Sequence, residues 1–276
     1  MIDAAKIQSH LSAFQLSNPE LIDETALAEI YRVELSDGTR AVLKCWRNNN
    51  SEQFGADYLE ALHGNGVVQV LGRREGALLM EHLEGPSLGS LSRNGRDAEA
   101  TEILARVALS LRQSTKSDLK NAPALQRWFR ALFDAEFARD CDPHLRINVE
   151  CCKDIARSLL TASTNEVVLH GDLHHDNVLA HKGKWIAIDP KGVCGDPAYE
   201  LANAMRNPKG TDQLMRDPAI IAYRAKVFAE SLQIDPKQML KWAAIKTALS
   251  ISWRENGCIG SDPESDLLNQ ILEMTA

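Results

Sequence analysis

The sequence contains no hydrophobic run of about 18 residues, the length that a membrane-spanning helix needs. Its start, Met1-Ile2-Asp3-Ala4, lacks the basic and apolar regions of a secretory signal. Its six cysteines form no Cys-x-x-Cys pair, so we expect free and mostly buried thiols. We therefore expect a cytoplasmic protein that does not bind a membrane.

The sequence also lacks an excess of basic residues. It carries 31 Lys and Arg against 38 Asp and Glu, a net charge of −7. Residues 1–84 hold 7 basic and 13 acidic side chains, and the remainder holds 24 and 25. Nucleic-acid binding depends on Lys and Arg that neutralise phosphates, so we expect no nucleic-acid partner. An acidic protein is compatible with a small, cationic substrate.

Two regions of different character follow one another along the 276 residues, of which 44% are hydrophobic. The first region predicts helices at 4–14 and 52–63 and strands at 24–35, 39–46, 67–71 and 77–81. The second predicts helices at 97–115, 123–139, 147–163 and from 197 onward, with strands at 166–169, 178–180 and 185–188. We predict an α+β protein with a small mixed N-terminal lobe, residues 1–84, and a mainly helical C-terminal lobe, residues 85–276.

Oxygen-bearing side chains gather where the predicted strands of the second region end. Asp172 and Asn177 lie in the loop between two short apolar strands, and Asp189 ends the next strand. At these junctions the three side chains can converge. Carboxylate and amide oxygens suit Mg²⁺, which also takes phosphate oxygens and water. This pattern predicts a magnesium site.

A zinc site is the alternative at the same place. His170 and His174 are four residues apart, and His175 is adjacent, so a helix would bring two imidazoles to one face. The flanking strands and Gly171 oppose a helix there. A zinc-dependent hydrolase and a nucleotide-binding protein without catalysis remain the rival hypotheses, and zinc retained through purification would support the hydrolase.

The same stretch resembles the catalytic segment of phosphotransferases with a protein-kinase-like fold, His-x-Asp-Leu-x-x-x-Asn followed by a metal-binding Asp. The matching positions are His170, Asp172, Leu173, Asn177 and Asp189. Pro190-Lys191 stands where protein kinases have Phe-Gly, and no Ala-Pro-Glu motif follows. The chain therefore resembles small-molecule kinases, not protein kinases.

Further motifs resemble the branch of streptomycin 6-phosphotransferases and hydroxyurea phosphotransferases, between about residues 20 and 260. They are Gly55-Ala56-Asp57-Tyr58-Leu59, Gly64-Asn65-Gly66-Val67-Val68, Leu71-Gly72-Arg73, Asp189-Pro190-Lys191-Gly192-Val193 and Gly195-Asp196-Pro197-Ala198-Tyr199-Glu200-Leu201-Ala202-Asn203. The resemblance implies a bilobal kinase that uses ATP and Mg²⁺ to phosphorylate a hydroxyl of an aminoglycoside such as streptomycin, or hydroxyurea. An amino sugar or amino alcohol is the alternative acceptor. We expect a monomer or weak dimer.

The resemblance also implies a role for individual residues. Lys44, at the end of Ala41-Val42-Leu43-Lys44, would neutralise nucleotide phosphates, aligned by Glu52 in preference to Glu60. Asn177 and Asp189 would hold Mg²⁺, and Asp172 would accept the proton of the acceptor hydroxyl. The nucleotide base would lie against Met80 and hydrogen-bond the backbone of Glu81 and Leu83. The glycine-rich loop of protein kinases is absent, and Thr25 is the candidate phosphate contact in its place.

Other expectations concern the surroundings of this site. We expect His170 to brace the loop, His174 and His175 to flank the phosphates, and Asp196 to tie the loop to a following helix. Candidate carboxylates for a cationic acceptor are Glu200, Glu255 and Asp262. Trp253 could line a sugar-sized pocket, but we expect it to fill the core.

Overall fold

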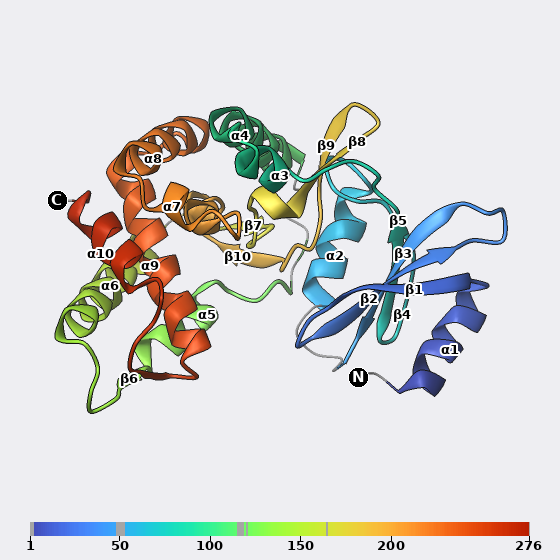
Figure 1. Ribbon diagram of the computed structural model, residues 1–276, viewed down its shortest axis with the longest axis horizontal. Helices are drawn as coiled ribbons and strands as arrows, with labels where there is room; N and C mark the ends of the chain where they lie inside the picture. The colour runs from blue at the N-terminus through green and yellow to red at the C-terminus, as the bar shows by residue number, and fades with distance from the viewer. Residues whose placement is uncertain (1–2, 48–52, 115–118, 120, 164, 276) are drawn as a thin grey trace.

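A sheet and a group of helices occupy opposite ends of the molecule (Figure 1). The computed structural model describes residues 3–47, 53–114, 119, 121–163 and 165–275. Five antiparallel strands form the sheet in the order β1-β2-β3-β5-β4. They are β1 (Ser17–Glu24), β2 (Ala28–Glu34), β3 (Arg40–Trp46), β4 (Val70–Arg74) and β5 (Ala77–Glu81). The arrangement confirms the predicted α+β class.

Strand β3 places Lys44 on the inner face of the sheet lobe by simple alternation. Ala41, Leu43 and Cys45 are fully buried on one face of the strand. Because successive side chains of a strand point to opposite faces, Lys44 points to the other side. Helix α1 (Ala4–Phe14) packs with the first face, and helix α2 (Gln53–Leu62) follows β3 in the chain. The strand therefore turns its lysine toward the helical lobe.

The rest of the chain is mainly helical. Its helices are α3 (Leu88–Arg93), α4 (Asp97–Ser114), α5 (Gln126–Phe133), α6 (Pro143–Ala162), α7 (Asp212–Met215), α8 (Pro218–Leu232), α9 (Pro236–Arg254) and α10 (Ser265–Glu273), with the short 3-10 turns η1 (His175–Asn177), η2 (Pro197–Tyr199) and η3 (Ala202–Arg206). Helix α9 packs against α5, α6, α8 and α10, and Trp242 on it stacks edge-on against Tyr199, with ring centroids 5.6 Å apart. No helix in the described ranges is long and apolar enough to cross a bilayer.

Two small β elements carry the predicted catalytic stretch. Strands β7 (Val167–Leu169) and β10 (Val193–Gly195) pair with each other, and β8 (Val178–His181) and β9 (Lys184–Ala187) form a hairpin. The hairpin is also bonded to the sheet lobe, because the Val68 N–H donates to Ala187 O at 2.9 Å, and to the segment just after β5, because the Gly85 N–H donates to Ala180 O at 3.0 Å. These bonds hold the catalytic stretch at the junction of sheet and helices.

The structure corrects several predicted elements. The helix expected at 123–139 ends at Phe133, and the chain then forms β6 (Glu136–Phe137), which pairs in parallel with β11 (Cys258–Ile259). The strand expected at 67–71 starts at Val70, because Val67 pairs with Ala187 instead. Strand β1 and helix α3 were not predicted. The domain boundary at residue 84 remains a prediction.

Candidate active site

One cavity of about 730 Å³ lies between the sheet and the catalytic stretch. Its volume falls within the range of small-molecule sites. The predicted site residues that line it are Thr25, Lys44, Met80, Glu81, Leu83, Asp172, Asn177 and Asp189. The predicted partner of Lys44, Glu52, lies outside the described residues. The fold therefore brings eight of the nine predicted residues to one place.

Two lysines converge on the carboxylate of Asp189. Lys44 Nζ lies 2.6 Å from Asp189 Oδ1, and Lys191 Nζ lies 3.0 Å from Oδ2. Burial opposes ionisation of this carboxyl, but the two ammonium groups outweigh it and lower its pKa to about 2. Asp189 also has a φ of 54°, a left-handed conformation that is uncommon outside glycine. The cavity thus holds a fixed carboxylate that stays charged near neutral pH.

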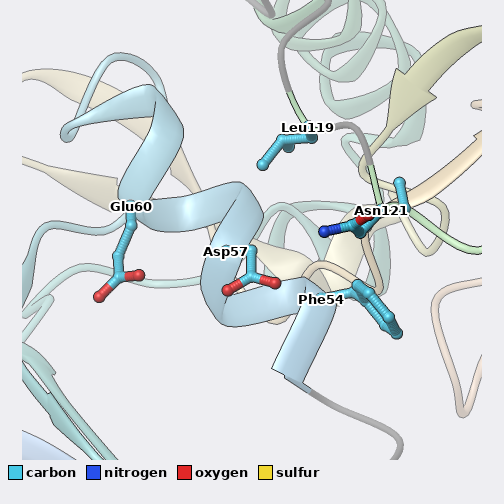
Figure 2. A pocket seen from close by; sticks show the side chains of 7 residues that line it. Phe54, Asp57, Glu60, Leu119 and Asn121 are labelled. Carbon is cyan, nitrogen blue, oxygen red and sulfur yellow. The ribbon is translucent and has the colours of Figure 1, made fainter.

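Glu60, the alternative partner for Lys44, is used elsewhere. Its Oε2 accepts a hydrogen bond from Arg73 Nη1 at 2.8 Å, and Asp57 accepts one from the same nitrogen. Both carboxylates also line a second hollow of about 470 Å³, which lies between α2 and the side chains of Leu119, Asn121 and Ala122 (Figure 2). Arg73 binds both carboxylates, but its single positive charge offsets only one of their two negative charges.

The start of α2 packs directly on the backbone beside Asp189. A Cβ on Gly55 would lie 2.0 Å from Pro190 O, and one on Gly192 would lie 2.3 Å from Phe54 O. Only glycine permits such close approach of two backbones. The two glycines therefore fix the segment after Asp189 against the helix of the sheet lobe.

Hydrogen bonds also fix the orientation of Asp172 and Asn177. Asn203 Nδ2 donates to Asp172 Oδ1 at 2.7 Å, and Asn177 Nδ2 donates to Asp172 O at 3.0 Å. Because the amide nitrogen of Asn177 is used, its Oδ1 is the atom left for a cation. The second carboxylate oxygen of Asp172 accepts no hydrogen bond within the described part of the chain. It is placed to accept a proton from a ligand in the cavity.

The histidines brace this loop. His170 Nδ1 accepts from the Asp172 N–H at 3.3 Å, and Nε2 lies 2.9 Å from Ile188 O. Burial lowers the pKa of His170 to about 4, so the ring is neutral near pH 7. His174 Nδ1 accepts from the Asp176 N–H and its ring lines the cavity, whereas His175 is fully buried away from it. The flanking role expected for His175 is therefore wrong.

These contacts also argue against zinc. Both ring nitrogens of His170 already have protein partners, and His175 does not reach the cavity. Across the described ranges, no three His, Cys, Asp or Glu side chains form a group suited to a metal ion. The oxygen pair Asn177 and Asp189 fits a hard divalent cation better, since such ions take phosphate oxygens and water as further ligands.

Of the backbone groups expected to contact the nucleotide base, one N–H is already used. The Glu81 N–H donates to Gln69 O at 3.0 Å, so a contact from the Glu81 backbone would come from its carbonyl and stays a prediction. The Leu83 N–H has no hydrogen-bond partner among the described residues, and it lies at the cavity. The Thr25 hydroxyl accepts from the N–H groups of Leu27 and Ala28 within a turn. Leu83 is therefore the donor available to a base.

Two of the three acidic residues expected to receive a cationic acceptor are already engaged. Glu200 is buried beneath the loop, where its carboxylate accepts from the N–H groups of His170 and Gly171, both at 3.0 Å. Asp262 is buried and paired with Arg254 at 2.7 Å.

Trp253 is 42% exposed, so the expectation that it fills the core is wrong. Asp196 caps η2 by accepting from the Ala198 N–H, as expected of a tie to the following turn.

Sequence reasoning missed the residues that support the site from a distance. Asn203 orients Asp172 from η3, and Lys191 holds Asp189. Lys246 is buried in α9, and the negative charge of Asp172 raises its pKa against the effect of burial. A signal for the last existed, because it is the single lysine within the mainly apolar stretch from Trp242 to Ser252.

Comparisons with known proteins agree with this geometry. A profile of the family described as "Aminoglycoside/hydroxyurea antibiotic resistance kinase" matches residues 14–257. A streptomycin 3''-kinase of Klebsiella pneumoniae is 32% identical over 73% of this chain and 75% of its own length. A streptomycin 6-kinase of Streptomyces glaucescens is 28% identical over 86% of this chain and 78% of its own. A hydroxyurea phosphotransferase of Kitasatospora aureofaciens is 29% identical over 70% of this chain and 57% of its own.

Solved structures show the same fold at low sequence identity. Aminoglycoside phosphotransferase APH(4)-Ia superposes with a TM-score of 0.65 at 14% identity, over 99% of this chain and 98% of that one. An ethanolamine kinase of Plasmodium vivax superposes with a TM-score of 0.62 at 12% identity, over 94% and 82%. An amicoumacin kinase solved with AMP-PNP and Ca²⁺ has a TM-score of 0.64 at 13% identity, over 99% and 93%. The bilobal kinase-like fold is therefore confirmed.

Proposed function

Because the chain belongs to the aminoglycoside/hydroxyurea antibiotic resistance kinase family, it is a small-molecule phosphotransferase, and we propose that it phosphorylates a hydroxyl of streptomycin. The observation that carries the proposal is the single cavity in which Lys44, Asp189, Asn177 and Asp172 meet. Named relatives that phosphorylate streptomycin support the choice of acceptor.

The residues divide the chemistry between charge and proton transfer. ATP lies with its base at the Leu83 N–H and its phosphates toward Lys44. Asn177, through Oδ1, and Asp189 would hold the divalent metal, which we propose is Mg²⁺, and which supplies positive charge to the phosphate oxygens when bound. Asp172 accepts the proton of the acceptor hydroxyl while the oxygen of that hydroxyl bonds to the γ-phosphorus. The bond from the γ-phosphorus to the bridging oxygen breaks, and ADP leaves.

Positioning and electrostatics carry most of this reaction, because phosphoryl transfer needs little covalent help from a protein. Asn203 and Asn177 orient the loop before substrate binds, and the glycine contact at α2 fixes the Asp189 segment. These contacts are made in the protein itself, so the loop and the Asp189 segment are oriented before the nucleotide binds.

The experiment that tests this proposal measures phosphoryl transfer from ATP to the acceptor. Purified protein is incubated with ATP, Mg²⁺ and one acceptor at a time, and ADP release is measured beside the mass of the acceptor. We expect streptomycin to gain one phosphoryl group, with Mn²⁺ able to replace Mg²⁺ and with EDTA stopping the reaction. Acceptor-dependent ADP release with neutral sugars or amino alcohols alone would reject streptomycin and keep the kinase. Zinc retained in the protein and required for activity would reject the metal assignment.

A further inference from the structure

Three lysines that the structure describes line the cavity of the candidate active site, and they differ in their partners. Lys44 and Lys191 both bind the carboxylate of Asp189. Lys209, which follows η3 in the chain, is exposed, and within the described part of the chain no carboxylate lies within ion-pair distance of its ammonium. The cavity therefore has a positive charge at Lys209 that no neighbouring carboxylate binds.

The backbone of Lys209 is held in place by two charged side chains. Its N–H donates to Asp176 Oδ2 at 3.3 Å, and Arg93 Nη1 donates to its carbonyl oxygen at 3.1 Å. Arg93 and Asp176 also bind each other, because Arg93 Nη2 lies 2.8 Å from Asp176 Oδ1. Since both backbone groups of Lys209 are used in this way, its ammonium is the polar group left to meet a ligand in the cavity.

These contacts place Lys209 beside one of the predicted metal ligands. Asp176 belongs to η1, directly before Asn177, and both residues line the cavity. Helix α3 packs closely on this turn, because a Cβ on Gly89 would clash with Asp176 Oδ1. Lys209 therefore reaches the cavity at η1, whereas Lys44 and Lys191 meet at Asp189.

We propose that the Lys209 ammonium binds a phosphate oxygen of the nucleotide, and that Arg93 and Asp176 position it for this contact. The inference rests on the proposed function, in which ATP occupies this cavity, and adds a phosphate contact at η1. The phosphate chain is the anion that this reaction brings to the cavity. An ammonium and a phosphate oxygen form a charge-assisted hydrogen bond, which is stronger than a neutral one.

The arrangement of charges favours this contact. Lys209 can bind phosphate without giving up an ion pair of the protein, whereas Lys44 and Lys191 are bound to Asp189 before the nucleotide arrives. Arg93 offsets the negative charge of Asp176, which would otherwise repel the phosphates from the same side. The ammonium of Lys209 is therefore free to add to the attraction for the nucleotide.

The test measures the binding of Mg·AMP-PNP and of adenosine by titration calorimetry, with no acceptor present. Lys209→Met removes the charge, and we expect about three- to tenfold weaker binding of AMP-PNP, as for loss of a partly exposed charged hydrogen bond, with adenosine binding unchanged. Lys209→Arg should retain most of the affinity. Lys226→Met is the matched control: it removes the same charge at an exposed position of α8 and should change neither affinity.

A double-mutant cycle tests the positioning role of Arg93. Arg93→Met should weaken AMP-PNP binding, and its effect should be smaller in the Lys209→Met protein, because Arg93 acts partly through Lys209. A residue that only stabilised the fold would have the same effect in both backgrounds. Equal effects would therefore overturn the positioning role.

The outcomes separate the phosphate contact from the proposed function. Unchanged AMP-PNP binding in Lys209→Met would overturn the inference. Equal weakening of AMP-PNP and adenosine would also overturn it, because it would show a change of the cavity as a whole. A loss confined to AMP-PNP would uphold the contact. If the same wild-type protein then transferred no phosphoryl group to streptomycin, the proposed function would fail and the contact would stand.

Discussion

Asp189 forms ion pairs with two lysines of the cavity. Lys44 and Lys191 each hold one of its oxygens in the protein alone. Nucleotide phosphates compete for the same ammonium groups, and a divalent cation competes for the carboxylate. Binding of Mg·ATP therefore exchanges ion pairs within the protein for ion pairs with the ligand, with the side chains already in place.

The Lys44→Met substitution tests this exchange. It removes the ammonium that faces the phosphates, and we expect kcat/KM for ATP to fall at least about 10²-fold, the typical loss for one preorganised charge. The control is Lys184→Met, at the exposed tip of the β8–β9 hairpin, which should retain full activity. Steady-state kinetics with varied ATP measure both. Wild-type kcat/KM in the Lys44 variant would remove this residue from the mechanism.

At the scale of elements, the strands around the catalytic loop were predicted from short apolar runs in the sequence. The polar residues at the ends of these runs, Asp172, Asn177 and Asp189, were predicted as site residues for the same reason. Strand β3 was predicted because a short, mainly apolar run follows the Asp37-Gly38 turn. Strand β1 was missed because all its residues are exposed and show no alternation. The early end of α5 was missed because β6 pairs with the distant β11, and no local pattern records such pairing. Trp253 was misplaced for a similar reason: helical spacing does not say which end of a buried helix reaches solvent.

The contact between α2 and the Asp189 segment gives a prediction at this scale. In an isolated helix, Gly55→Ala would stabilise by about 1 kcal/mol. Here the new Cβ would lie 2.0 Å from Pro190 O, so we expect a net destabilisation of about 1–3 kcal/mol and a lower kcat as the segment shifts. Gly260→Ala is the control, because its Cβ meets only an ordinary contact at 3.5 Å. Thermal unfolding compares the two, and a more stable Gly55 variant with full activity would refute the contact.

For the whole molecule, Glu200 links stability to pH from beneath the catalytic loop. Burial raises the pKa of its carboxyl to about 7 from an ordinary value of 4.5, although the N–H groups of Gly171 and His170 favour the charged form. Between these values the folded protein holds a proton that the unfolded chain releases. This contribution to stability is complete below about pH 4.5 and is lost as the pH rises toward 7.

A comparison with Glu200→Gln isolates that contribution. Between pH 5 and pH 8 we expect the melting temperature of the wild type to fall relative to that of the variant, since glutamine does not titrate. The difference between the two proteins cancels the titration of all other groups. Equal changes in both proteins would show that Glu200 does not titrate in this window.

The oligomeric state remains a prediction of a monomer or weak dimer. Light scattering across a range of protein concentrations should give the mass of one chain, 30.5 kDa, at the lower concentrations. A constant mass of twice that value would contradict the prediction.

The division of labour between Asp172 and Asp189 is the central claim, and one paired measurement tests it most directly. For Asp172→Asn and Asp189→Asn, kcat is measured beside the affinity for Mg·AMP-PNP. Asp172→Asn should lose at least about 10²-fold in kcat while binding the nucleotide like the wild type, because it removes only the proton acceptor. Asp189→Asn should weaken nucleotide binding itself, because it removes a metal ligand. Near-wild-type turnover in Asp172→Asn, or loss of Mg·nucleotide binding in that variant, would contradict the account.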